Sequence, residues 1–201
     1  MSIDWSEQGL EDLATDILTG ETAAEPRVDY GLGDVTPGGY RKRSSEAYDR
    51  DRCLLPKDVY DFVVATQPET WRRLRQHYAD RTRERFAQRL SSEVEKRGAV
   101  DVLRNGVTDR GCDFEMVFFK PETSKNPALR DKYKANVFTV VPQLRYERDG
   151  GTKALDLALF LNGLPLFTAE LKNPTTRQNY RDAIRQYKED RDPHEPLFQF
   201  W

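Results

Sequence analysis

The feature that most constrains this chain is a predicted β-hairpin in its C-terminal third. Two apolar runs, Ala154–Leu161 and Pro165–Leu171, flank the dipeptide Asn162-Gly163, which is a strong short-range signal for a hairpin turn. Runs of this length and composition are typical of strands. Because helical patterns precede and follow this hairpin, the sequence predicts an α/β fold.

Three charged residues interrupt the apolar hairpin. Asp156 lies inside the first strand, where an unpaired carboxylate is costly to bury, and Glu170 and Lys172 end the second. Glu-x-Lys alone is typical of an ordinary ion pair at a strand end. With Asp156 one strand away, however, two carboxylates suit Mg²⁺, and the adjacent lysine can act on a metal-bound water. Asp156, Glu170 and Lys172 are therefore the candidate catalytic residues, and the two acids are the candidate metal ligands.

This site requires an irregular hairpin. With a regular two-residue turn, Asp156 pairs with Ala169, and Glu170 then faces the opposite side of the sheet. A three-residue loop or a bulge instead places Asp156 across from Glu170. Pro165, which has no N–H to donate, favours such an irregular start to the strand. We therefore predict a shift in strand register between the turn and the two carboxylates.

Elsewhere, the patterns predict helices first and strands later. The expected helices are Ser6–Leu18, capped by Ser6, then short turns over Val59–Ala65, one long helix over Trp71–Arg97, and Asn179–Asp190. The expected strands are Asp113–Phe119 and Asn136–Tyr146, in which Pro142 implies an edge or a bulge. Gly20–Tyr40 and Pro121–Ala128 are expected to be irregular.

Composition excludes several classes of protein. The 32 lysines and arginines against 34 acidic residues give a net charge of -2, which excludes a uniformly basic nucleic-acid binder but not a local basic face. No apolar run is long enough to cross a membrane and the start does not resemble a signal peptide, so we expect a soluble, cytoplasmic protein. The two cysteines and two histidines are too scattered to suggest a zinc site.

Two further sets of residues have open interpretations. The long predicted helix carries many arginines, Arg81 and Arg85 among them, and these form either a solvated face or a surface that contacts phosphates. Gln143 and Arg145, on the strand before the hairpin, are either ordinary strand surface residues or residues that face DNA.

A resemblance to a known family follows from the hairpin and its flanks. The run ALDLALFLNGLPLFTAELKNP, followed by AIRQYKEDRDP and EPLF, is similar to the N-terminal nuclease region of the restriction subunit of type I restriction–modification enzymes. Asp156, Glu170 and Lys172 resemble the PD-(D/E)xK motif of that region, with Leu155 at the position of its proline. The VFTVVPQLRY strand and the SEQGLEDLATDIL helix fit the same family in order and spacing.

The resemblance implies a restriction-endonuclease-like core, a central mixed β-sheet flanked by helices. It implies a single domain over residues 1–201, mainly helical over 1–110, with the catalytic sheet and the following helix over 111–201. The implied activity is magnesium-dependent hydrolysis of duplex DNA, with Asp156 and Glu170 binding Mg²⁺ and Lys172 assisting the water or the transition-state charge. A helix before the sheet often supplies another glutamate in this fold, for which Glu11 is the candidate and Glu7 the alternative.

Type I nuclease domains also carry a Gln-x-x-x-Tyr element on the helix after the motif. Gln186 fits its first position, whereas Asp190 stands where the tyrosine is expected and Tyr187 is adjacent to the glutamine. The resemblance therefore implies auxiliary roles for Gln186 and Tyr187, the latter without a matching position.

Family members are large subunits in which this domain precedes an ATP-driven translocase, and they work with methyltransferase and specificity subunits. Because this chain has no P-loop and stops after an apolar run, we expect a truncated chain that uses ATP only through domains absent from it. Two alternatives stay open: a DNA- or subunit-docking module of the same fold without turnover, and a stand-alone repair-type nuclease with the same motif.

Overall fold

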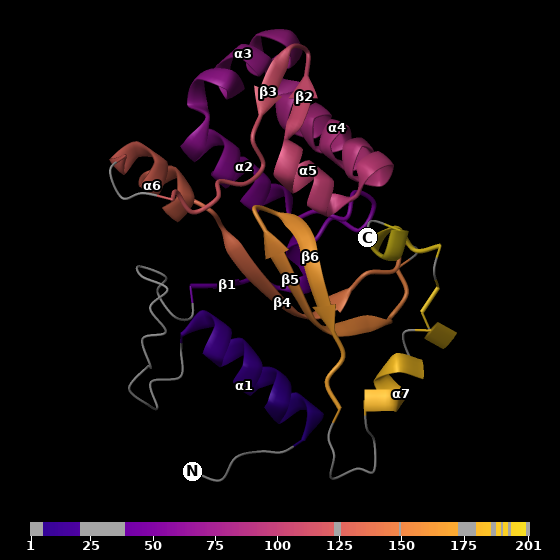
Figure 1. The fold of residues 1–201 in the computed structure, drawn as a ribbon. Coiled ribbons are helices and arrows are strands. Elements are labelled where there is room, and N and C mark those ends of the chain that lie inside the picture. The colour runs from indigo at the N-terminus through magenta and orange to yellow at the C-terminus, as the bar shows by residue number, and fades with distance from the viewer. Residues whose placement is uncertain are drawn as a thin grey trace.

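A four-stranded mixed sheet forms the centre of the computed structural model (Figure 1). Its strands lie in the order β1 (Arg41–Lys42), β4 (Phe138–Arg145), β5 (Ala154–Leu161) and β6 (Leu164–Ala169). β1 is parallel to β4, and the other neighbours are antiparallel. The structure describes residues 6–20, 39–122, 126–148, 150–172, 180–185, 188–189, 191–192 and 194–199. The predicted mixed sheet flanked by helices is confirmed.

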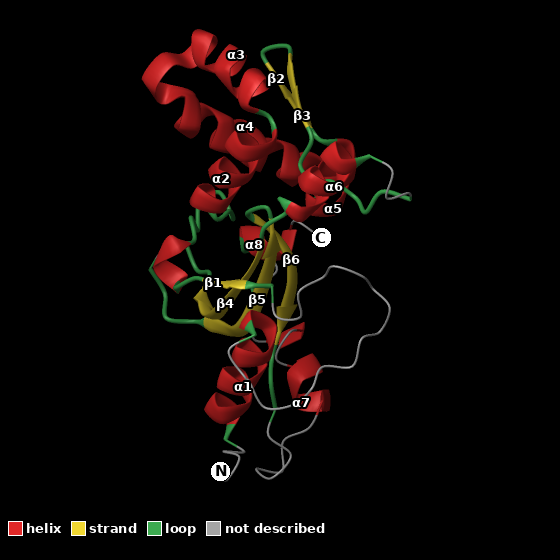
Figure 2. Cartoon of the chain, turned by 90° about the vertical axis from the view of Figure 1, so that its left-hand side faces the viewer, coloured by secondary structure: helices red, strands yellow, loops and turns green. Residues whose placement is uncertain are grey.

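Helices lie beyond both ends of this sheet (Figures 1 and 2). One end carries α2 (Pro56–Thr66), α3 (Pro68–Tyr78), α4 (Thr82–Arg97) and α5 (Ala99–Asn105), with a small hairpin of β2 (Val107–Asp109) and β3 (Cys112–Phe114). The other end carries α1 (Glu7–Thr19) and α7 (Tyr180–Arg185). The remaining elements are η1 (Ser45–Ala47), η2 (Ala79–Arg81), α6 (Pro127–Lys134) and α8 (Pro196–Gln199).

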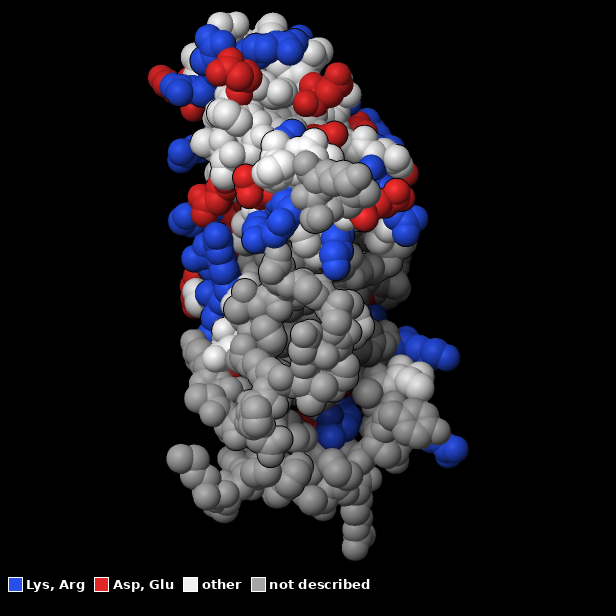
Figure 3. Space-filling model, turned by 60° about the vertical axis from the view of Figure 1, so that its left-hand side comes forward, with Lys and Arg blue, Asp and Glu red and all other residues white. Residues whose placement is uncertain are grey.

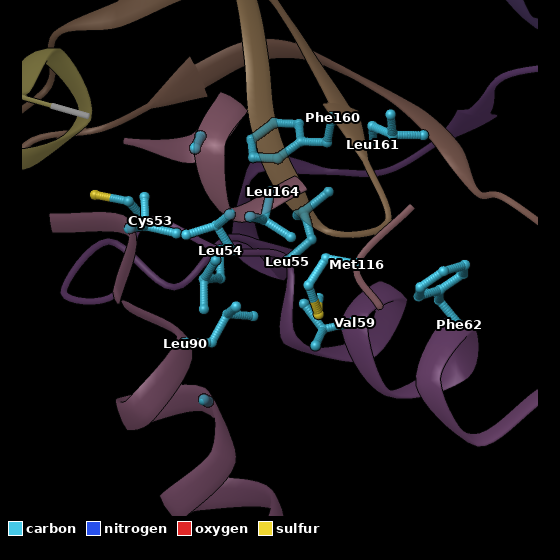
Figure 4. Close-up of a cluster of buried hydrophobic side chains, with 14 of the residues drawn as sticks. Cys53, Leu54, Leu55, Val59, Phe62, Leu90, Met116, Phe160, Leu161 and Leu164 are labelled. Carbon is cyan, nitrogen blue, oxygen red and sulfur yellow. The ribbon is translucent and has the colours of Figure 1, made fainter. Parts of the chain in front are cut away.

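The main hydrophobic core joins the first group of helices to the tip of the hairpin. Leu54 and Leu55, which precede α2, and Val59 in its first turn lie close to Phe160 and Leu164 of the hairpin strands (Figure 4). All five are almost completely buried. Burial of one such side chain stabilises a fold by about 1.5–3 kcal/mol, so this core anchors the closed end of the hairpin.

The hairpin turn itself is built into that core. Asn162 and Gly163 have φ angles of 53° and 84°, the left-handed values that the tight turn predicted from their sequence requires. The Asn162 amide accepts a hydrogen bond from the N–H of Val137 (2.7 Å) and donates to the carbonyl of Met116 (2.8 Å). The carbonyl of Gly163 accepts from the N–H of Leu55 (2.9 Å). These contacts fix where both hairpin strands begin.

The prediction of one continuous helix over Trp71–Arg97 is wrong. The chain leaves the helix at Ala79, whose φ is 50°, and passes through η2 before α4 begins. Thr82 donates a hydrogen bond to the carbonyl of Ala79 (2.6 Å) across this break. The apolar pattern is interrupted between Tyr78 and Phe86, and Thr82 is the one buried residue among the seven that separate them.

Other boundaries also differ from those predicted. The expected loop over Pro121–Ala128 ends in α6, because Asn126 caps the helix and accepts from the N–H of Leu129. The strand expected over Asp113–Phe119 is only the three-residue β3. β6 ends at Ala169, two residues before the predicted end, so Glu170 lies just beyond it. Within the described ranges, no helix is long and apolar enough to cross a bilayer.

Candidate active site

The hairpin contains the predicted change of register. At its tip Leu161 pairs with Leu164, as in a regular two-residue turn. Further along, Leu159 pairs with Phe167 and not with Leu166, so Leu166 is an extra residue on β6. Such a bulge shifts every later pair by one residue. The predicted irregularity is therefore confirmed as a bulge that follows a regular turn.

The shifted register brings the two acidic residues of the hairpin together. The last pair of the ladder is Leu157 with Ala169, so the next residues, Asp156 and Glu170, lie opposite each other. The carboxylate of Asp156 accepts a hydrogen bond from the N–H of Leu171 at 2.6 Å. This contact holds Asp156 against the segment that leaves β6.

Gln143 lies opposite Asp156 on the other neighbouring strand, between the pairs Pro142–Leu157 and Leu144–Leu155. Its φ is 47°, an unusual value inside a strand, and strained backbone of this kind is often found at functional sites. Its side-chain nitrogen lies 2.6 Å from a carboxylate oxygen of Glu11 and 3.5 Å from one of Asp156. The amide thus joins two acids from different elements.

Glu11 reaches this site from α1. The helix begins at the Ser6 cap, whose hydroxyl accepts from the N–H of Gly9 (3.0 Å), and one turn later Glu11 is only 3% exposed. Burial raises the pKa of Glu11, the hydrogen bond from Gln143 opposes that rise, and the charge of Asp156 adds to it. Glu7, the alternative, is exposed in the first turn. The structure therefore brings Glu11 to the acidic residues.

Glu170 is held by an arginine that the sequence did not single out. The side chains of Glu170 and Arg191 are 2% and 6% exposed and form an ion pair. Arg191 also donates to the hydroxyl of Tyr146 (2.8 Å) and to the carbonyl of Ala154 (2.9 Å), and its guanidinium lies 5.3 Å from the centre of the Tyr146 ring. Arg191 is part of the string that carries the family resemblance, but no local spacing connects it with a residue 21 positions earlier.

The charged groups around Glu170 shift its pKa in opposite directions. Burial raises the pKa of Glu170 to about 7, the Arg191 guanidinium pulls it down, and the Asp156 carboxylate pushes it up. Lys172 also lowers the pKa of Glu170, so its ammonium group is near enough to act on this carboxylate. Lys172 is itself partly exposed.

The donor chemistry of this site fits a hard divalent cation. Glu11, Asp156 and Glu170 offer only carboxylate oxygens, the ligands that Mg²⁺ prefers, and the negative charge of Asp156 raises the pKa of both glutamates. In the part of the chain that the structure describes, no three His, Cys, Asp or Glu side chains are already gathered as a metal-binding group. Gln143 and Arg191 instead hold the two glutamates.

The other predicted residues lie at different places. Arg81 pairs with Glu84 (3.7 Å) and Arg85 donates to Gln88 (3.2 Å) on η2 and α4, at the far end of the sheet from the acidic residues (Figure 1). Figure 3 shows basic and acidic side chains interspersed at that end. Arg145 lies at the end of β4 and is exposed. Gln186 and Tyr187, and also Asp190, lie outside the described residues.

Comparison with known families gives a match over most of the chain. A model described as the type I restriction enzyme R protein N terminus matches residues 46–201. Searches among curated proteins and among solved structures gave no match. The matched segment contains Asp156, Glu170 and Lys172, whereas Glu11 precedes it. The family points to a nuclease module of a restriction system that acts on DNA within a multisubunit complex. Because the match extends over well more than half of the sequence, this chain belongs to the family of type I restriction enzyme R protein N-termini.

Proposed function

We propose that this chain is a magnesium-dependent endonuclease module that hydrolyses phosphodiester bonds of duplex DNA. The observation that carries the proposal is the bulge in the hairpin, which sets Asp156 opposite Glu170. A structural hairpin would gain nothing from two carboxylates placed across from each other, because like charges on paired strands destabilise a sheet. Their juxtaposition is what a cation-binding site requires.

Asp156 and Glu170 would hold Mg²⁺, with Glu11 as a further carboxylate. The bound ion supplies Lewis-acid stabilisation of the phosphate and a water of lowered pKa. The raised pKa values of Glu11 and Glu170 support this assignment, because both reflect charge that burial and a neighbouring acid leave poorly compensated. A divalent cation would relieve that imbalance.

The basic and amide groups would organise these acids. Arg191 keeps Glu170 in place by also bonding Tyr146 and Ala154. The Gln143 amide fixes the spacing between Glu11 and Asp156. Lys172 is partly exposed beside Glu170, where an ammonium group can orient the attacking water or stabilise negative charge on the phosphate.

Cleavage of supercoiled plasmid by the 201-residue chain tests this proposal. We expect Mg²⁺-dependent nicking that Lys172→Ala abolishes and Lys57→Ala leaves unchanged, since Lys57 is an exposed lysine of α2 paired with Asp61. Glu11→Gln and Glu7→Gln form a second matched pair, in which only the first should lose activity. Undiminished nicking by Lys172→Ala would contradict the mechanism.

One observation favours a second candidate, a DNA- or subunit-docking module without turnover. The ion pair with Arg191 occupies an oxygen of Glu170 that a metal would use. DNA binding by the wild-type chain without any Mg²⁺-dependent nicking would favour this alternative. A stand-alone repair-type nuclease is the third possibility, and in-frame helicase motifs downstream in the genome would argue against it.

A further inference from the structure

A basic hollow adjoins the acidic residues on the β1 side of the sheet. It has a volume of about 490 Å³ and is lined by residues 42–46 and by Pro142, Gln143 and Arg145. Gln143 belongs both to the hollow and to the group of acidic residues, because its amide donates a hydrogen bond to Glu11 at 2.6 Å. The hollow is therefore the immediate neighbour of the proposed cleavage site.

The sequence explains why the sheet is open here. β1 pairs with β4 only at Thr139 and Val140, and the N–H of Arg43 donates to the carbonyl of Val140 (3.0 Å). The backbone groups of Pro142 also point toward β1, since backbone groups two residues apart in a strand point the same way. Pro142 has no N–H there, so the pairing cannot continue. The chain leaves the sheet and turns into η1.

Hydrogen bonds connect the wall of the hollow to neighbouring elements. Arg43 donates to the carboxylate of Asp58 (2.8 Å), which is fully buried and also accepts from the Thr139 hydroxyl (2.6 Å). The N–H of Arg145 donates to the Ser45 hydroxyl (2.8 Å). The loop from β1 to η1 is thus tied to both α2 and β4.

The charge of the lining is predominantly positive. Lys42, Arg43 and Arg145 face a single acid, Glu46, and Arg43 is already neutralised by Asp58. Lys42 and Arg145 are exposed, and among the described residues neither has a carboxylate within ion-pair distance. Their charges act on neighbouring acids only at longer range, Lys42 on Glu11 and Arg145 on Glu46.

We propose that this hollow binds a backbone phosphate of the DNA strand next to the phosphate that is cleaved, through Lys42 and Arg145. The inference rests on the proposed nuclease function, since the hollow lies beside its acidic residues. Arginine and lysine bind phosphate oxygens without reading bases. One such contact on the β1 side would hold the strand while the acidic residues act on the neighbouring phosphate.

Binding of a fluorescent 30-base-pair duplex in EDTA tests this site separately from cleavage. We expect Lys42→Gln/Arg145→Gln to weaken binding and to lower the slope of log K against log salt by about 2, close to one for each basic side chain that no longer neutralises a phosphate. Arg75→Gln/Arg104→Gln removes the same charge from exposed positions on α3 and α5 and should leave the slope within about 0.5 of the wild-type value. The charge-conserving Lys42→Arg/Arg145→Lys variant should bind almost as well as the wild type.

The outcomes separate this inference from the proposed function. Equal slopes for the hollow variant and the control, or no duplex binding by the wild-type chain, would overturn the phosphate site. A loss of binding restricted to one of two unrelated duplex sequences would also overturn it, because a phosphate contact is independent of sequence. If the Lys42→Gln/Arg145→Gln variant binds the duplex more weakly in EDTA while the wild-type chain does not nick plasmid in Mg²⁺, the phosphate site is supported and the nuclease function is refuted.

Discussion

The two ends of the β5–β6 hairpin are built in opposite ways. At the closed end, the Asn162 amide is paired with backbone groups and Gly163 packs against α2, within an apolar core (Figure 4). At the open end, Asp156 and Glu170 face each other with buried Glu11 close by. The closed end thus stabilises the fold and sets the register, while the open end concentrates negative charge that the fold alone does not need.

The largest effect is expected from Asp156→Asn, which keeps the shape of the open end and removes its charge. If the bound cation supplies several kcal/mol of transition-state stabilisation, nicking should fall about a thousandfold. The free energy of unfolding should change by less than about 1 kcal/mol, because an amide oxygen can still accept from Leu171. Plasmid nicking measures the loss of activity, and urea unfolding measures the change in stability. A much lower free energy of unfolding for this variant would show that Asp156 at the open end also stabilises the fold, as residues of the closed end do.

Arg191→Met is expected to lower the free energy of unfolding by about 3 kcal/mol, because it leaves Glu170 buried without its cation. Adding Glu170→Gln should recover much of this loss, since the uncompensated charge is then gone. Urea unfolding of both single variants and the double variant gives the coupling energy. Strict additivity would show that the ion pair is not an important interaction at the open end.

At the closed end, Gly163→Ala is expected to cost about 2–3 kcal/mol in free energy of unfolding. A Cβ there would lie 2.7 Å from both the carbonyl oxygen of Leu55 and the backbone nitrogen of Val59, at a φ of 84°. Gly111→Ala is the matched control, because Gly111 has a φ of 72° but nothing within 4 Å of its Cβ. We expect the control to cost about 1 kcal/mol from backbone strain alone. Equal losses of unfolding free energy in the two variants would show that packing of Gly163 against α2 does not contribute.

The smallest effect concerns pH and Cys53, a buried core residue that lies beside Leu54 (Figure 4). Burial raises the pKa of Cys53 from 9.0 to about 11, so the fold favours the protonated thiol. This contribution is complete below about pH 9 and is lost as the pH rises through about 11. Unfolding free energies of wild type and Cys53→Ala between pH 8 and 11 should therefore differ less at the alkaline end. A constant difference would show that the thiol does not titrate between these two pKa values.

Local patterns were sufficient for much of the fold and part of the candidate site. The Asn162-Gly163 turn, the limits of β5 and the helix capped by Ser6 follow from turn chemistry and short-range periodicity. The bulge could be predicted because Asp156 and Glu170 share a face only with a shifted register. The break at Ala79 could not, because the spacing from Tyr78 to Phe86 also fits a continuous helix, and no local signal shows that the backbone takes a positive φ at Ala79.

The sequence by itself determined the hairpin, its family and the identity of Asp156, Glu170 and Lys172 as the candidate catalytic residues. Only the tertiary structure decided that Glu11 rather than Glu7 reaches them, that Gln143 joins Glu11 to Asp156, and that Arg191 holds Glu170. The physical reason is the range of the contacts. Strand alternation and turn geometry act over a few residues, whereas the Glu11–Gln143 contact joins residues 132 positions apart, which only the packing of α1 on the sheet can bring together.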